Sequence, residues 1–292
     1  MPVTHSRTDV QRLLDTHGLR PRRSLGQNFV VDPNTVRRIV RLADVDEGTP
    51  VAEVGAGLGS LTLALAETGA HVVAIETDPA LVAVLSSVLA SSECRGTVTV
   101  LEGDALHLDW IDLLPPGPVP WRIVANLPYN VATPVVMRVL ESAPHVGCML
   151  VMVQREVGER MAARTGSRAY GAVSAKIAYW ATAAIVGRVP ATVFLPRPKV
   201  TSVLIRIDRR PCPAVPPSVG YDRFCRVVNA GFGQRRKMLR GSLAGVVEQR
   251  AFASAGVRDD LRAEDLDVEA WGALAGWIGG ADGREPTASH DR

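Results

Sequence analysis

A glycine-rich turn at residues 55–59 is the first place where this chain could bind a small molecule. The apolar run Val51–Val54 leads directly into it, and a helical pattern follows. Glycine lets the backbone turn tightly and lets a ligand approach main-chain N–H groups at the start of a helix. The next apolar run ends in Glu76, 21 residues after Gly55, where a carboxylate can accept both hydroxyls of a ribose. The pattern predicts a ligand that contains adenosine, and NAD and S-adenosylmethionine both satisfy it.

Three further positions favour S-adenosylmethionine. Dinucleotide-binding turns carry a glycine where this chain has Ser60. The third apolar run ends in Gly103-Asp104-Ala105, where the Asp104 carboxylate could accept a hydrogen bond from an adenine amino group. The fourth run ends in Asn126-Leu127-Pro128-Tyr129, which has no use in hydride transfer but suits the methylation of an amine. A nicotinamide-dependent dehydrogenase is therefore the least favoured of the enzymatic interpretations.

The Asn126–Tyr129 sequence has the residue types that methylation of an adenine amino group requires. The N6 lone pair is delocalised into the ring, so the amine must pyramidalise before it can attack a methyl group. The side-chain oxygen of Asn126 and the backbone carbonyl of Pro128 can hold the amino hydrogens and direct the lone pair, which is catalysis mostly by positioning. Tyr129 can stack on the base. No strong general base is needed, because the amine loses its proton easily once alkylated.

Length and composition place these motifs in an ordinary globular protein. The 292 residues are 47% apolar and 22% charged, enough for a buried core and unlike a disordered chain. No uncharged apolar stretch approaches the ~18 residues that a bilayer requires, and the first residues do not resemble a secretory signal. The four cysteines are scattered, which predicts neither a metal site nor a disulfide framework. We expect a cytoplasmic protein.

Short β-branched runs alternate with helical patterns from residue 51 onwards. Such an alternation predicts βαβ units, a parallel sheet with helices on both faces, and an α/β Rossmann-like fold. The proline-rich Pro211–Pro217 reads as a linker, and Tyr221–Leu243 is helical in pattern. The predicted domains are 1–210, an N-terminal arm and catalytic domain, and 211–280, a helical RNA-binding domain, followed by a disordered tail at 281–292.

Five motifs occur together in one order: Leu25–Phe29, Glu53–Gly59, Gly103–Ala105, Asn126–Tyr129 and Phe194–Ser202. In this combination the chain resembles the ribosomal RNA adenine N6,N6-dimethyltransferase family, most of all its small-subunit (16S) branch. The resemblance covers roughly residues 20–245. It implies a class I S-adenosylmethionine-dependent methyltransferase with a smaller C-terminal helical domain. It also implies S-adenosyl-L-homocysteine as the product and no metal.

The resemblance also implies roles for individual residues. Asn126 would lie between the cofactor and the target amine, and Phe194 would be an exposed platform that stacks on the adenine opposite Tyr129. The catalytic residues would thus be Asn126, Pro128, Tyr129 and Phe194. The residues implied to bind the cofactor are Asn28, the backbone of Val30, Gly55, Glu76, Asp104 and Asn126.

Positive charge is concentrated in two blocks, although the whole chain is only +3. Residues 1–41 hold eight Lys or Arg against three acidic residues, and residues 197–240 hold eleven against two. Such clusters bind phosphate backbones by releasing counterions, with little reading of sequence. The run at 235–237 is expected on a helix. The predicted RNA-binding residues are Arg22, Arg23, Arg223, Arg235, Arg236 and Lys237.

The implied substrate is a pair of adjacent adenosines near the 3′ end of small-subunit rRNA, within a preassembled subunit. Two alternatives stay open: a large-subunit (23S) rRNA methyltransferase of the macrolide-resistance type, and a non-catalytic assembly factor with the same fold. The Phe194–Ser202 sequence and the extended C-terminus favour the small-subunit enzyme, and the intact Asn126–Tyr129 motif argues against a pure scaffold. We expect a monomer.

Overall fold

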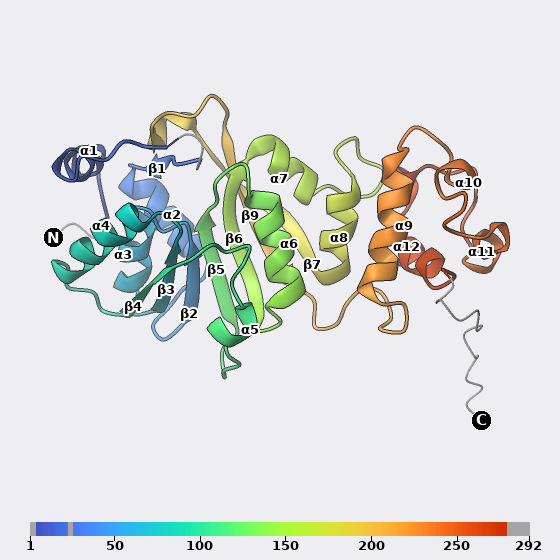
Figure 1. Cartoon of the computed structure of the whole chain (residues 1–292), viewed down its shortest axis with the longest axis horizontal. Coiled ribbons are helices and arrows are strands. Elements are labelled where there is room, and N and C mark those ends of the chain that lie inside the picture. The colour runs from blue at the N-terminus through green and yellow to red at the C-terminus, as the bar shows by residue number, and fades with distance from the viewer. Residues whose placement is uncertain (1–3, 23–25, 279–292) are drawn as a thin grey trace. The chain divides into compact units, whose positions relative to one another are not determined.

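Two compact units are present in the computed structural model, which describes residues 4–22 and 26–278 (Figure 1). The first holds the described residues up to Ala162 together with Trp180–Pro211. The second holds Ala163–Tyr179 together with the described residues from Cys212 onwards. The sequence analysis had placed Ala163–Tyr179 in the catalytic domain, whereas its contacts lie in the second unit. The expected tail at 281–292 falls outside the described residues.

A mixed seven-stranded sheet forms the centre of the first unit, in the order β4-β3-β2-β5-β6-β9-β7. Strands β2 to β6 are parallel, and β9 is antiparallel to both its neighbours, β6 and β7. The strands are β2 (Pro50–Val54), β3 (His71–Glu76), β4 (Thr97–Glu102), β5 (Trp121–Asn126), β6 (Val146–Gln154), β7 (Ala181–Val189) and β9 (Ser202–Arg209). The predicted α/β Rossmann-like class is confirmed. Strand β7 was not predicted, since its sequence does not alternate between apolar and polar residues: Ala183 to Val186 form one unbroken run of apolar residues.

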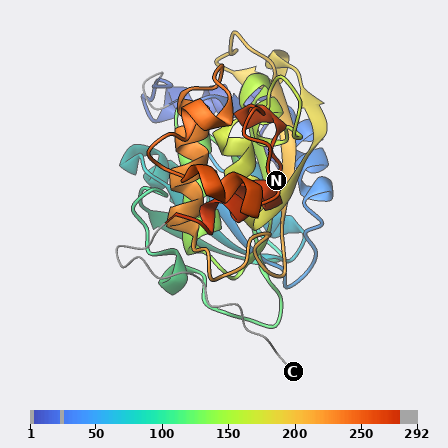
Figure 2. The ribbon, with the colours of Figure 1, turned by 90° about the vertical axis from the view of Figure 1, so that its right-hand side faces the viewer.

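Helices cover both faces of this sheet (Figures 1 and 2). They are α2 (Pro33–Leu42), α3 (Ser60–Glu67), α4 (Pro79–Ala90), α5 (Trp110–Leu113), α6 (Ala132–Ser142) and α7 (Arg155–Met161). Helices α2 and α3 share a buried cluster with Leu204 of β9. The neighbouring Val203 and Ile205 point to the other face, where they lie against Gly158 of α7. Asp32 caps α2 by accepting from the Thr35 N–H, as the Asp32-Pro33 sequence predicted.

A second, two-stranded sheet joins segments far apart in the sequence. Strand β1 (Phe29–Val30) pairs antiparallel with β8 (Phe194–Leu195), which follows the short 3-10 turn η2 (Ala191–Val193). Helix α1 (Arg7–Thr16) is capped by Ser6 and packs through Val10 and Leu14 against Phe29. Neither strand was predicted, because two residues carry no periodicity.

The second unit is helical. Its elements are α8 (Ala172–Trp180), α9 (Tyr221–Gly233), α10 (Leu239–Ser242), α11 (Gln249–Ser254), the 3-10 turn η3 (Ala263–Asp265) and α12 (Val268–Ala275). Helices α9 and α12 meet so closely that a Cβ on Gly231 would lie 2.4 Å from the Trp271 ring, so only glycine fits there. The expected continuous helix to Leu243 is wrong. Helix α9 ends at Gly233, a poor helix former, and Gln234 leaves the helical region at φ −126° and ψ 49°.

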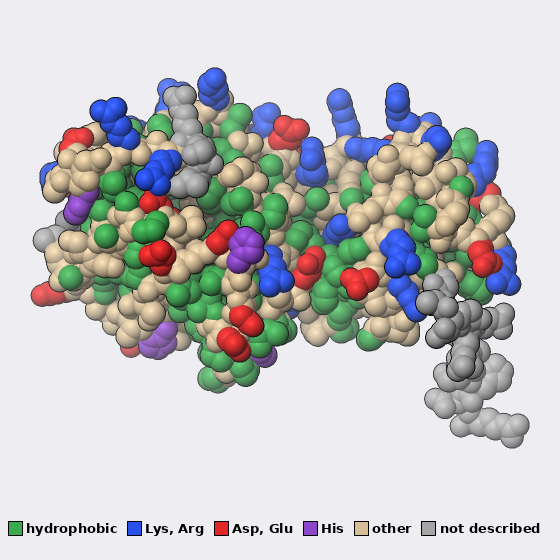
Figure 3. Space-filling view, viewed as in Figure 1, with side chains coloured by type: hydrophobic (Ala, Val, Ile, Leu, Met, Phe, Trp, Pro, Cys, Tyr) green, Lys and Arg blue, Asp and Glu red, His purple; other side chains and the backbone are tan. Residues whose placement is uncertain are grey.

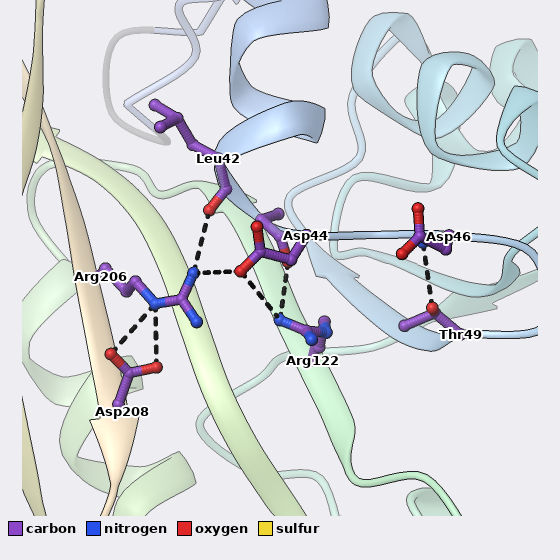
Figure 4. Close-up of polar contacts among 8 residues, drawn as sticks. Leu42, Asp44, Asp46, Thr49, Arg122, Arg206 and Asp208 are labelled. Carbon is purple, nitrogen blue, oxygen red and sulfur yellow. Dashed lines mark hydrogen bonds and ion pairs between the residues drawn. The ribbon is translucent and has the colours of Figure 1, made fainter.

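Helix α2 is anchored to strands β5 and β9 by a cluster of charged side chains (Figure 4). Arg206 of β9 binds the Asp44 carboxylate and the Leu42 carbonyl, and its Nε donates to both oxygens of Asp208. Arg122 of β5 donates to the Ala43 carbonyl at 2.8 Å. The two guanidinium groups therefore bind carbonyls that the end of α2 leaves without helical partners.

We predict that Arg206→Ala lowers the free energy of unfolding by about 2 kcal/mol, because it removes several charge-assisted hydrogen bonds at once. Urea unfolding is the measurement. Arg188→Ala, at an exposed position on neighbouring β7, is the control and should change stability by less than about 0.5 kcal/mol. Equal effects of the two substitutions would contradict an anchoring role for the cluster.

Candidate active site

An open cavity lies where the parallel strands end. Strand β2 has β3 on one side and β5 on the other, so the chain order reverses at β2 and opens a crevice at the carboxyl ends. All six residues predicted to bind the cofactor line this cavity, namely Asn28, Val30, Gly55, Glu76, Asp104 and Asn126. Pro128 lines it too.

The glycine turn has the geometry that its sequence indicated. Gly55 and Gly57 have φ of 76° and 57°, in the left-handed region that side chains disfavour. The main-chain N–H of Gly55 donates to the Ile75 carbonyl at 2.8 Å, which fixes the turn against β3. A Cβ on Gly57 would come within 3.2 Å of the Phe29 ring. The turn is thus closely packed on one side and open to the cavity on the other.

Glu76 lies at the end of β3 with 6% of its surface exposed. Its Oε1 accepts from the N–H groups of Thr77 and Asp78, and its Oε2 accepts from Gly57 at 2.9 Å. Burial raises the pKa of Glu76, while these hydrogen bonds oppose the rise. Because Oε2 has one backbone donor, it retains a lone pair for a ligand hydroxyl.

Asn126, the last residue of β5, has a fixed orientation. Its Nδ2 donates to the Asn28 carbonyl at 2.9 Å. Among the described residues none donates to its Oδ1, so this oxygen can accept from an amino group. Asn28 holds its own loop in turn, through a hydrogen bond from Nδ2 to the Gly26 carbonyl.

The two predicted aromatic platforms differ. Tyr129 is half-buried, and its hydroxyl lies 2.9 Å from Oγ of Ser202, a fully buried residue at the start of β9. Phe194 is 0% exposed and packs in the core beneath β8, so the expectation of an exposed platform is wrong. Its strand pairs Phe194 with Val30, and both side chains belong to the same buried cluster. Neither aromatic residue lines the cavity.

Asp104 is the most solvated of the predicted cofactor residues. It follows β4, with 48% of its side chain exposed. Its Oδ1 accepts from the Leu106 N–H at 2.9 Å, and its Oδ2 lies 3.1 Å from Nδ1 of His107. These contacts hold the carboxylate at the edge of the cavity.

Glu53 is a cavity-lining acid to which the sequence analysis gave no role. It is 1% exposed and accepts a hydrogen bond from the Thr62 hydroxyl. Burial raises its pKa to about 8, and the nearby Glu76 charge adds to the rise. Its position directly before the glycine turn was visible in the sequence, but its complete burial was not.

The predicted RNA-binding residues fall into three groups: two in the basic loop before β1, one that is paired within the second unit, and three others on the second unit. Arg22 lies 3.5 Å from the Asp78 carboxylate, and Arg23 lies outside the described residues. Arg235 forms an ion pair with Glu264 at 2.7 Å and donates to the Arg168 carbonyl, so it holds the second unit together.

The remaining three lie on the second unit: Arg223 is half-buried on α9, while Arg236 and Lys237 are exposed in the turn between α9 and α10. The prediction that the run 235–237 lies on a helix is wrong. Figure 3 shows basic side chains protruding above this turn.

Within the part of the chain that the structure describes, no three His, Cys, Asp or Glu side chains are arranged to hold a metal ion. None of the helices described is long and apolar enough to span a bilayer.

The sheet order, the glycine turn and the acids at the strand ends define a class I S-adenosylmethionine-dependent methyltransferase fold. Two solved structures share it. One is a dimethyladenosine transferase from Plasmodium falciparum, with a TM-score of 0.67, 20% identity, and coverage of 83% of this chain and 94% of that one. The other is the 23S rRNA methyltransferase ErmE, with a TM-score of 0.65, 26% identity, and coverage of 86% and 99%.

The chain belongs to the ribosomal RNA adenine dimethylase family, whose model matches residues 18–279. It is 46% identical over 276 residues to "Ribosomal RNA small subunit methyltransferase A" of Kineococcus radiotolerans, covering 92% of this chain and 90% of that protein. It is 48% identical to the protein of the same name from Cutibacterium acnes, covering 89% of each. The resemblance noted from the five motifs is confirmed.

We predict that Glu53→Gln makes stability less dependent on pH. The pKa of Glu53 rises from 4.5 to about 8 on folding, so its stabilising contribution is complete below 4.5 and is lost as the pH rises towards 8. The free energy of unfolding of the wild type should therefore fall, relative to the variant, between about pH 5 and pH 8. Urea unfolding across that range measures it. Glu102→Gln, at an exposed position, is the control, and parallel profiles for wild type and Glu53→Gln would contradict the assignment.

Proposed function

We propose that this protein transfers methyl groups from S-adenosylmethionine to N6 of two adjacent adenosines near the 3′ end of small-subunit (16S) rRNA, giving dimethyladenosines. The observation that carries the proposal is Asn126, whose Oδ1 has no donor among the described residues and which lines one cavity with Glu76 and Asp104. The relatives named as small-subunit methyltransferases, 46–48% identical over about nine-tenths of the chain, support the substrate.

The residues of the cavity fit S-adenosylmethionine by the chemistry of their donors and acceptors. Oε2 of Glu76 has a lone pair for a ribose hydroxyl, and Asp104 offers acceptors for an adenine amino group. Near Gly55 a Cβ would find only ordinary contacts, the closest at 3.7 Å, so the turn leaves space for the methionine part. Asn28 and Val30 also line the cavity. When bound, this cofactor supplies a methyl group on a sulfonium.

The chain's own residues then have positioning roles. Oδ1 of Asn126 and the carbonyl of Pro128 accept the amino hydrogens of the target adenine, which aims the nitrogen lone pair at the methyl group. Tyr129 stacks on the base, and Ser202 holds the Tyr129 hydroxyl so that the ring keeps one orientation. Phe194, being buried, contributes by supporting the loop that follows β8.

The RNA partner is small-subunit rRNA, within a preassembled small subunit, and the enzyme acts as a cytoplasmic monomer. The exposed Arg236 and Lys237, together with Arg223 at the opposite end of α9, would contact its phosphates. Arg22 could contribute if it leaves Asp78, since that pair is long and partly solvated.

A large-subunit target is the second candidate, since ErmE, a 23S rRNA methyltransferase, has the same fold at 26% identity. The deciding experiment incubates the protein with labelled S-adenosylmethionine and unmodified small or large subunits. Dimethyladenosine in the small-subunit rRNA is the expected product. Label in 23S rRNA alone, or in neither RNA, would overturn the proposal.

Asn126→Ala should lower kcat by at least about 100-fold, because it removes the oxygen that orients the amine. Binding of S-adenosylhomocysteine, measured by calorimetry, should change far less. Asn34→Ala, at an exposed position on α2, is the matched control and should methylate normally. Full dimethylation by Asn126→Ala in cells that lack the enzyme would refute its catalytic role. A wild-type protein that adds no methyl groups in the same cells would instead favour an assembly factor with the same fold.

The double variant Arg236→Glu/Lys237→Glu should weaken binding to small subunits by about 10- to 100-fold at low salt, with a smaller difference as salt rises. Affinity for S-adenosylhomocysteine should stay the same. Arg250→Glu/Arg258→Glu makes the same charge change on exposed residues of the same unit and is the control. An equal loss in both double variants would show that net charge, rather than this turn, determines RNA affinity.

A further inference from the structure

The first described residues of the chain reach the glycine turn. The Thr4 hydroxyl donates to the carbonyl of Ser60 at 2.8 Å, and Nε2 of His5 lies 2.9 Å from the carbonyl of Leu58. Thr4 and His5 are 1% and 8% exposed, so both contacts are shielded from water. Burial lowers the pKa of His5, in keeping with a neutral ring that donates its N–H to the carbonyl. Two main-chain carbonyls, one in the glycine turn and one at the start of α3, are thus held by residues outside the sheet.

The same segment also contacts η2 and β8, which lie beside β1. Nη2 of Arg7 donates to the carbonyls of Thr192 and Phe194, at 2.9 and 3.1 Å. Phe194 belongs to β8, which pairs with β1 and so with the loop that carries Asn28. The Val31 N–H adds a hydrogen bond to the Val193 carbonyl at 2.8 Å. One short segment therefore contacts both the glycine turn and the strand pair beside it.

Apolar packing continues this connection. Val10 and Leu14 of α1 share a buried cluster with Leu58 of the glycine turn and Phe29 of β1. Leu58 and Phe29 both line the cofactor cavity. We use the term N-terminal arm for residues 4–16, which comprise the Thr4–Arg7 contacts and α1.

We propose that the N-terminal arm is a positioning element for the cofactor site, in which Thr4, His5 and Arg7 hold the glycine turn at a fixed separation from the β1–β8 pair. This inference rests on the proposed function, since it assigns the arm to the S-adenosylmethionine site. A binding site gains affinity when its walls are held in the bound geometry before the ligand arrives. The arm contacts none of the predicted catalytic side chains, so its effect should be on cofactor binding.

The test uses the full chain with Thr4→Val/Arg7→Ala, which removes three hydrogen bonds and keeps the apolar face of α1. The dissociation constant of S-adenosylhomocysteine, measured by calorimetry, should rise about tenfold. The KM for S-adenosylmethionine should rise in parallel, with kcat at saturation within about twofold of the wild type. Amide hydrogen exchange at residues 57–60 and 192–195 should become faster in the ligand-free protein. Thr4→Ser combined with Arg7→Ala keeps the hydroxyl at position 4 and should therefore bind more tightly than Thr4→Val/Arg7→Ala, with part of the lost affinity restored.

Arg12→Ala is the matched control, because Arg12 lies on the exposed face of α1 and, among the described residues, forms its ion pair with Asp9 of the same helix. It should leave cofactor affinity and exchange unchanged. A double variant with lower unfolding stability but unchanged affinity and exchange would overturn the inference, since the arm would then be merely structural. If the wild type itself fails to bind S-adenosylhomocysteine, the proposed function is wrong. This result differs from a normal wild type with an unaffected double variant, which would contradict only the role of the N-terminal arm.

Discussion

The hydrogen bond from the Asn126 side chain to the Asn28 carbonyl determines what this site can do. A side-chain amide has a donor end and an acceptor end, and anchoring the nitrogen fixes the orientation of the oxygen, which can then accept from a ligand. The anchor is only as firm as the loop that carries Asn28. That loop is held by the pairing of β1 with β8 and by the contact of Phe29 with Gly57. The orientation of the Asn126 side-chain oxygen therefore depends on β1 and β8, two strands of only two residues each.

Two buried acids at the same edge of the sheet have different surroundings. Glu76 accepts three backbone hydrogen bonds, which favour its charged form, whereas Glu53 accepts one from the Thr62 hydroxyl. Burial raises both pKa values, and the raised value of about 8 for Glu53 keeps that group neutral below that pH. The cavity therefore holds one carboxylate suited to accepting hydroxyls, beside a neutral acid that spares it a second buried charge.

Features that depend on neighbouring residues, such as turns, strand ends and helix caps, were predictable from the sequence. Contacts between residues far apart in the sequence were not. The glycine turn, the strand ends at Glu76 and Asn126 and the capped start of α2 depend on neighbouring residues, so their positions followed from pattern alone. The burial of Phe194 depends on its pairing with Val30, more than 160 residues away, and no local signal marks it. The membership of Ala163–Tyr179 in the second unit is likewise a matter of long-range packing.

The basic run at 235–237 shows how a single backbone change separates residues that look alike in sequence. On a continuous helix, residues 235 and 236 would point about 100° apart, and both could face a phosphate. The helix instead ends at Gly233, and the turn carries Arg235 back onto Glu264 and the Arg168 carbonyl. Arg236 and Lys237 are left exposed to solvent. Charge density read from sequence therefore overstates the cations available to RNA, since at least one of the three already neutralises a carboxylate within the protein.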